Sequence, residues 1–189
     1  MSNFEIITIT LSFIVGIGVA QLLSSFAMAF RGRTEHSLHW MPFAWGIVIL
    51  IFSIQYWFAL LDLNKTLAGG WDWLWYGQML ILAVALFLAG ALVLPSRVSF
   101  AKGDLLDDFV THGRYSLLAL AAYLLGWIPA NMRMNNGEPL HEAYLFNIAL
   151  AILALIAFKS RSSRVWLTTT VLFYLLFALT LLSIYSTPG

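Results

Sequence analysis

The chain has 189 residues, of which 61% are hydrophobic and 10% charged, and its formal net charge is +1. A soluble domain carries about 25% charged residues, and a disordered chain needs low hydropathy and high charge, whereas the mean hydropathy here is +0.85. The composition therefore excludes both classes and predicts an integral membrane protein. The chain has no cysteine, which excludes disulfide scaffolds, cysteine-ligated metal sites and thiol catalysis.

Charged residues divide the sequence into apolar runs long enough to be compared with the thickness of a bilayer. A transmembrane α-helix needs about 20 apolar residues, within a range of about 17–25. The runs cover residues 6–30, 40–61, 73–96, 115–132, 143–158 and 165 almost to the C-terminus. The run 143–158 is short, but residues 139–141 extend it. We expect an all-α polytopic bundle with six transmembrane helices; four or five crossings plus a re-entrant segment is the alternative.

Basic residues indicate the orientation of the bundle, because Lys and Arg are enriched in cytoplasmic loops. The connections after the first, third and fifth expected helices hold eight of the ten basic residues, and the other side has only Lys65 and Arg133. The eight are Arg31, Arg33, Arg97, Lys102, Arg114, Lys159, Arg161 and Arg164. We therefore expect these connections to be cytoplasmic and both termini to lie outside.

The longest cytoplasmic connection, residues 97–112, lies between two groups of three expected helices. Apolar and acidic residues alternate over 105–112, and Asp104 is a typical N-cap, which predicts a short amphipathic helix on the cytoplasmic surface. We expect one transmembrane domain, residues 1–189. Three crossings per half give the halves 1–96 and 104–189 opposite orientations, as in the inverted repeats of transporters, and Leu38-His39 corresponds in position to Leu140-His141.

Small residues recur at every fourth position of the first expected helix. They are Thr8, Ser12, Gly16, Ala20 and Ser24. In lipid there is little hydrophobic drive between helices, so close backbone approach through small residues supplies the association. This small-residue stripe predicts tight packing of one helix face on another helix, either in the same chain or in a second copy.

Neutral amides are the polar groups of interest within the expected spans, because no charged residue or histidine lies near the middle of any span. Since buried charges normally mark ion or proton paths, a proton-coupled pump or a voltage sensor is disfavoured. Gln21 lies toward the cytoplasmic end, whereas Gln55, Gln78 and Asn147 lie in the outer halves of their helices. Amides avoid facing lipid, so all four form interhelical hydrogen bonds or line a polar cavity. We hypothesise that Gln55, Gln78 and Asn147 converge on one site.

Catalytic and metal-binding patterns are weak in this sequence. Asp108 and His112 share a helix face and His39 begins the second span on the same side, but the spacing matches no established metal site, and a local hydrogen-bonded pair explains it. No nucleophile elbow and no phosphate-binding loop is found. We expect no catalytic residue, metal or cofactor, and no nucleic-acid partner.

Two classes of function remain. The first is a small oligomeric channel or uncoupled transporter for an ion or small solute, and the second is a non-catalytic scaffold or accessory subunit that binds lipid or a partner in a larger membrane complex. The expected partners are therefore the bilayer and either further copies of the chain or another membrane protein. The compact chain and its short loops suggest a bacterial inner (plasma) membrane protein.

Overall fold

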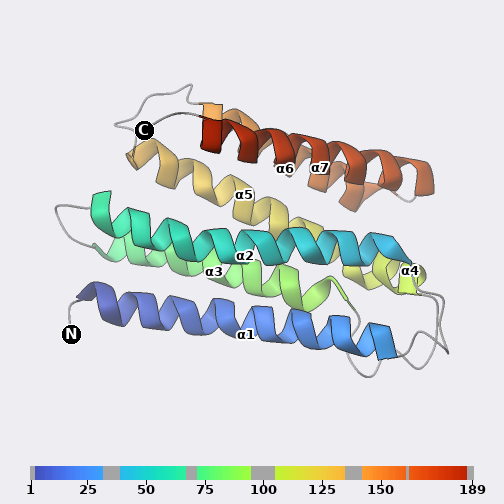
Figure 1. The fold of residues 1–189 in the computed structure, drawn as a ribbon, viewed down its shortest axis with the longest axis horizontal. Helices are drawn as coiled ribbons and strands as arrows, with labels where there is room; N and C mark the ends of the chain where they lie inside the picture. The colour runs from blue at the N-terminus through green and yellow to red at the C-terminus, as the bar shows by residue number, and fades with distance from the viewer. Residues whose placement is uncertain are drawn as a thin grey trace.

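In the computed structural model, the described residues are 3–31, 39–66, 72–94, 105–134, 142–160 and 162–186, and they form a bundle of helices (Figure 1). The long helices lie side by side along the bundle, and a short helical segment precedes α5. The elements are α1 (Asn3–Arg31), α2 (Trp40–Thr66), α3 (Trp73–Leu92), α4 (Leu105–Asp108), the π-helix η3 (Phe109–Gly113), α5 (Tyr115–Met134), α6 (Glu142–Lys159) and α7 (Ser163–Ser186).

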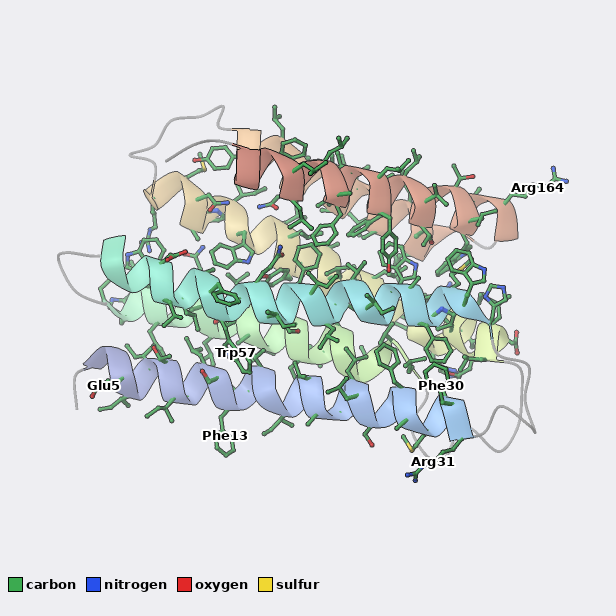
Figure 2. The ribbon with its side chains drawn as sticks, in the orientation of Figure 1. Glu5, Phe13, Phe30, Arg31, Trp57 and Arg164 are labelled. Carbon is green, nitrogen blue, oxygen red and sulfur yellow. The ribbon has the colours of Figure 1, made fainter. Side chains whose placement is uncertain are left out.

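The six long helices form a closed ring in the order α1, α3, α5, α6, α7, α2, in which each helix contacts the next and α2 returns to α1. Long helices that follow one another in the chain run in opposite directions (Figure 1). As a result, α1 begins and α7 ends at the same end of the bundle (Figure 1). We call this the terminal end; it carries Glu5 (Figure 2). The other, which we call the basic end, carries Arg31 and Arg164 (Figure 2).

Five of these helices, α1, α2, α3, α5 and α7, are long and apolar enough to cross a membrane. The chain is therefore an integral membrane protein built as a helical bundle, as the composition predicts. The apolar part of α6, Tyr144–Lys159, is shorter than these five helices. It corresponds to the apolar run 143–158, the shortest of the six runs in the sequence. A sixth crossing consequently stays a prediction, as do the orientation of the bundle and the inverted repeat.

Two glycines lie where α1 and α3 approach each other closely. A Cβ atom on Gly18 would lie 3.1 Å from the Cα atom of Phe87, and one on Gly90 would lie 3.4 Å from the carbonyl oxygen of Gly18. Both helices therefore use the missing side chain to bring their backbones together, as small residues do in membrane bundles. Gly16 lies on a different face, where a Cβ atom would meet nothing within 4 Å.

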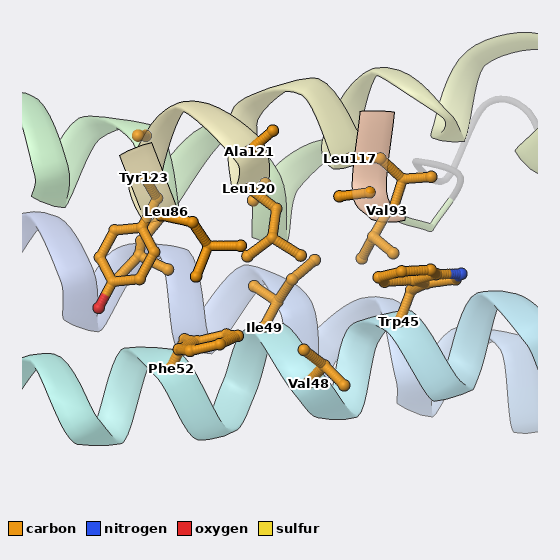
Figure 3. Close-up of a cluster of buried hydrophobic side chains, with 14 of the residues drawn as sticks. Trp45, Val48, Ile49, Phe52, Leu86, Val93, Leu117, Leu120, Ala121 and Tyr123 are labelled. Atoms are coloured by element: carbon orange, nitrogen blue, oxygen red, sulfur yellow. The ribbon is translucent and has the colours of Figure 1, made fainter. Parts of the chain in front are cut away.

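Helix α2 supplies much of the core, and over residues 40–52 apolar residues occupy every side of it. Trp45, Val48, Ile49 and Tyr56 are each 0% exposed. In Figure 3 the side chains of Trp45, Ile49 and Phe52 point toward residues of α3 and α5. Which face of α2 is buried thus depends on the helices that pack against it. It cannot be predicted from hydropathy, because apolar residues lie on every side of this part of α2.

The segment expected as a short amphipathic helix is helical but not a regular α-helix. It consists of the four residues of α4 and the five residues of η3, and Asp104 lies outside the described residues. Phe109 is 0% exposed, and its ring packs edge-on against Trp166 at 5.2 Å between centroids. Asp107 and His112 are exposed, so the segment fixes α5 to the start of α7 through one apolar face.

The two glycines of α1 provide a test of this packing. Replacing Gly18 by Leu should lower the free energy of unfolding by about 1–3 kcal/mol, because the side chain must displace the α3 backbone. Gly16→Leu is the matched control, and its effect on the isolated chain should be near zero. Thermal unfolding of both variants in detergent measures the difference, and equal melting temperatures for Gly18→Leu and the unsubstituted chain would contradict the packing.

Candidate functional site

A cavity of about 550 Å³ lies among α2, α5, α6 and α7. Ligand-binding cavities are typically about 300–1,000 Å³ and combine apolar walls with a few polar groups. The lining residues are Phe52, Gln55, Phe58, Ala59, Asp62, Tyr123, Leu124, Trp127, Asn131, Asn147, Leu150, Phe177, Thr180 and Leu181. All of them lie in the halves of their helices that are nearer the terminal end or at the midpoint, so the cavity occupies one half of the bundle.

The cavity begins where direct contact between α2 and α7 ends. In the basic half, Tyr174 Oη donates a hydrogen bond to the Ala44 carbonyl at 2.7 Å, and Trp45 packs against Phe173 at 4.8 Å between ring centroids. Further along, Phe52 and Phe177 lie 5.0 Å apart by the same measure, and both line the cavity. This last pair therefore forms its inner boundary.

Aromatic rings make up much of the cavity wall. Phe52 packs against Tyr123 at 5.7 Å with an interplanar angle of 62°, and Tyr123 packs against Trp127 at 6.2 Å with an angle of 87°. Edge-to-face packing of this kind is favourable for aromatic pairs. Phe52 and Tyr123 are only 7% and 2% exposed, so these rings are packed mainly on one another and close the wall of the cavity.

Polar groups line the rest of the cavity and come from all four helices. Three amides and one hydroxyl contribute neutral hydrogen-bond donors and acceptors, and they belong to Gln55, Asn131, Asn147 and Thr180. Asp62 lies at the end of the cavity that is nearer the terminal end of the bundle, and its side chain is exposed. It is the one formally charged residue of the lining. The cavity therefore offers polar groups from four helices to a ligand.

The structure brings together two of the three amides expected to converge. Gln55 and Asn147 line the same cavity from α2 and α6. Gln78 does not line it; instead its Nε2 donates a hydrogen bond to the Gly126 carbonyl at 3.1 Å and links α3 to α5. Gln21 is exposed in the basic half of α1 and is not among the lining residues.

Tyr56, which follows Gln55 in the chain, is not among the lining residues of the cavity. Its Oη donates a hydrogen bond of 2.7 Å to the Met79 carbonyl on α3. Tyr56 and Gln78 thus connect the same helix, α3, to α2 and α5 respectively. The convergent site therefore holds Gln55 and Asn147, while Gln78 serves helix packing.

The small-residue stripe of α1 lies along a groove that no other described helix lines. Ala20 and Ser24 are exposed, and Phe13, on the same side, points away from the bundle (Figure 2). A groove of about 460 Å³ follows the stripe and is lined by Thr8, Ile9, Ser12, Phe13, Gly16, Ile17 and Ala20. Among the described helices none covers this groove, and α1 approaches α3 through Gly18 instead.

The acidic and histidine residues at the basic end do not form a metal site in the described part of the chain. His112 Nδ1 and Asp108 Oδ1 are 3.4 Å apart, and the histidine side chain is 77% exposed. His39 Nδ1 instead accepts a hydrogen bond from the Met41 amide at 3.3 Å. Over the described ranges, no group of three or more His, Cys, Asp or Glu residues lies close enough to hold a metal ion.

Sequence reasoning missed several residues of the cavity. Gln55, Ala59 and Asp62 are spaced so that they share one face of α2, and this spacing does mark the polar wall. Asn131 interrupts an apolar run in the same way and could have been included. Nothing in the sequence pairs Tyr123 or Trp127 with α2, because aromatic residues also occur throughout the lipid-facing surface.

Comparison with protein-family models, curated proteins and solved structures found no match for this chain. The site is therefore interpreted from its own chemistry.

The cavity predicts which positions water reaches within the bundle. In this cysteine-free chain, single cysteines replacing Gln55 or Asn147 should react with a water-soluble thiosulfonate reagent, because the reactive thiolate forms in water. The neighbouring positions Ile54 and Ile148 are exposed on the outer surface of the bundle and serve as matched controls. In lipid, Ile54→Cys and Ile148→Cys should stay unmodified, and labelling of the four variants at one common rate would contradict a hydrated cavity.

Proposed function

We propose that this chain binds a small solute in the cavity and carries it across the membrane as an uncoupled transporter. The observation that carries the proposal is the one-sided cavity: it is lined by amides and aromatic rings in the terminal half, whereas aromatic packing of Trp45 with Phe173 and of Phe109 with Trp166 fills the basic half. A cavity closed at one end is expected of a carrier that opens to each side in turn.

The same packing favours a carrier over an open channel. A permanent pore requires a continuous hydrated path through the bundle. At the inner boundary of the cavity, the aromatic side chains of Phe52, Tyr123 and Phe177 lie between the helices and interrupt such a path. Coupling to an ion gradient normally uses buried charges. Of the described lining residues only Asp62 is charged, and it lies near the helix end.

The proposed topology follows from the distribution of charge. We assign six crossings, with α6 as the sixth, both termini outside, and the segment α4–η3 at the cytoplasmic surface. Arg31, Lys159 and Arg164 at the basic end then face the cytoplasm, in agreement with the enrichment of basic residues there. In this arrangement, in what we take to be a bacterial inner membrane, the cavity opens toward the outside.

Filling the cavity tests this function. Ala59 lines the cavity, so Ala59→Trp should occupy it, whereas Ala122→Trp adds the same side chain at an exposed position of α5. Purified protein in lipid nanodiscs is incubated with a small-molecule extract of the expression host, washed, and analysed by mass spectrometry. At least one compound should be retained by the unsubstituted chain and by Ala122→Trp but not by Ala59→Trp.

The retained compound is then tested for uptake into proteoliposomes without an ion gradient, where Ala59→Trp should reduce uptake to the rate of empty vesicles. Identical sets of retained compounds for the unsubstituted chain and Ala59→Trp would show that the cavity is not a binding site.

A second candidate function, a scaffold or accessory subunit, is favoured by the groove along α1. This groove is lined by small residues and is not covered by any other described helix of the chain. Oligomers of this chain or a membrane-protein partner would use it through close helix contact. Gly16→Leu should then reduce the mass of the complex measured by native mass spectrometry without lowering the melting temperature, and an unchanged mass would remove this candidate.

A further inference from the structure

Arg114 lies at the junction of η3 and α5, one residue before the apolar span Tyr115–Arg133 begins. Its guanidinium carbon lies over two aromatic rings, 5.4 Å from the centroid of Tyr115 and 5.7 Å from that of Phe158 on α6. Both distances are within the range of a cation–π interaction. Residues at the boundary of an apolar span lie at the level of the lipid headgroups, so two rings hold a cation at this level.

The charge of Arg114 has no counter-ion in the part of the chain that the structure describes. Over these ranges no carboxylate lies within ion-pairing distance of it, and its guanidinium group makes no hydrogen bond to another residue. The Nε atom is shielded from solvent and still lacks an acceptor. Since an unsatisfied donor on a charged group is costly, an anion from outside the chain would stabilise this arrangement.

The acidic residues at the basic end do not neutralise this surface. Asp107 and Asp108 lie in or beside α4, which contacts α2, and Asp108 Oδ1 is 3.4 Å from His112 Nδ1. The halves of α5, α6 and α7 at this end contain no acidic residue. Lys159 ends α6, Arg164 lies in the first turn of the neighbouring α7, and both are exposed. The surface from α5 across α6 to α7 therefore carries positive charge.

A phosphate group attached to an apolar chain suits this surface. A guanidinium binds two phosphate oxygens through parallel hydrogen bonds and stacks on aromatic faces at the same time. Tyr115 is 46% exposed, so its ring also borders the surroundings of the bundle, where the acyl chains lie in a membrane. Basic pockets between transmembrane helices are known to bind anionic headgroups.

We propose that the surface where α5 begins and α6 ends binds the phosphate of an anionic phospholipid. The Nη groups of Arg114 donate hydrogen bonds to the phosphate, Lys159 adds a second positive charge, and the rings of Tyr115 and Phe158 hold the guanidinium in place. The cavity lies in the other half of the bundle, so this site does not depend on the proposed transport function.

Two lipids with the same acyl chains separate the charge of the headgroup from general attraction to an apolar surface. The purified chain in an uncharged detergent is titrated with dioleoyl phosphatidylglycerol or dioleoyl phosphatidylcholine, and the complex with one lipid is measured by native mass spectrometry. The anionic lipid should reach half-occupancy at a concentration roughly tenfold lower, a ratio that corresponds to about 1.4 kcal/mol. Half-occupancy at equal concentrations would overturn the proposal.

Substitutions of equal charge locate the site. Arg114→Gln should raise the half-occupying concentration of phosphatidylglycerol roughly tenfold. Arg31→Gln is the matched control: it removes one exposed charge at the same end, but on α1, whose neighbours in the ring are α2 and α3, and it should leave the value unchanged. Equal weakening by both substitutions would show diffuse attraction to the basic end and would overturn the site.

A conservative variant keeps the test valid if Arg114→Gln does not fold, which its melting temperature reports. Arg114→Lys retains the charge but loses the planar group that binds phosphate through two bonds. It should therefore bind phosphatidylglycerol more weakly than the unsubstituted chain. Unchanged affinity in Arg114→Lys would show that charge alone acts here and would contradict the proposed phosphate contact.

Glycerol phosphate, which has the phosphate but no acyl chain, distinguishes a lipid from a free phosphate ester. In excess over the lipid, it should not displace phosphatidylglycerol from the unsubstituted chain, because it lacks the apolar contacts of the bound lipid. Displacement by glycerol phosphate, together with binding of this compound that Arg114→Gln abolishes, would assign the site to a soluble phosphate ester and would overturn the lipid as its ligand.

Discussion

The packing of Phe52 against both Tyr123 and Phe177 sets the separation of α2 from α5 and α7 near the middle of the bundle. Small residues bring α1 and α3 together until their backbones nearly touch, but α2 faces α5 through large aromatic side chains. Rings of this size hold the two helices apart, and the space beyond them toward the terminal end is the cavity. Replacing the rings by small side chains would let the helices approach and would close it.

This arrangement divides the bundle into two halves with different chemistry. On one side of the three rings, Trp45, Phe109, Trp166 and Phe173 interlock and bury their surfaces. On the other side, α2, α5 and α6 carry amides and a carboxylate among the apolar side chains that line the cavity. A polar group within the bilayer is retained only where it finds a partner or water, so the polar half of the bundle is the part in which a ligand is expected.

The sequence predicts the class of fold because lipid imposes a simple rule on helix length, and α1, α2, α3, α5 and α7 follow that rule. It does not predict which face of a helix is buried, since both faces are apolar. Gly16 and Gly18 illustrate this: the regular spacing singles out Gly16, yet Gly18 contacts α3. Gln55 and Gln78 lie at similar depth, and only their neighbours decide that one lines the cavity while the other bonds to Gly126.

The closure of the ring by α2 and α7 has a consequence for biogenesis. The hydrogen bond from Tyr174 to Ala44 joins residues 130 positions apart in the chain. During synthesis α2 enters the membrane long before α7, so the sides of Trp45 and Phe52 that pack against Phe173 and Phe177 are left uncovered by this helix until α7 arrives. Contacts between such distant segments form late in folding. The cavity thus comes into existence only when α7 has been inserted, and a chain arrested before that point has the other long helices but no enclosed cavity.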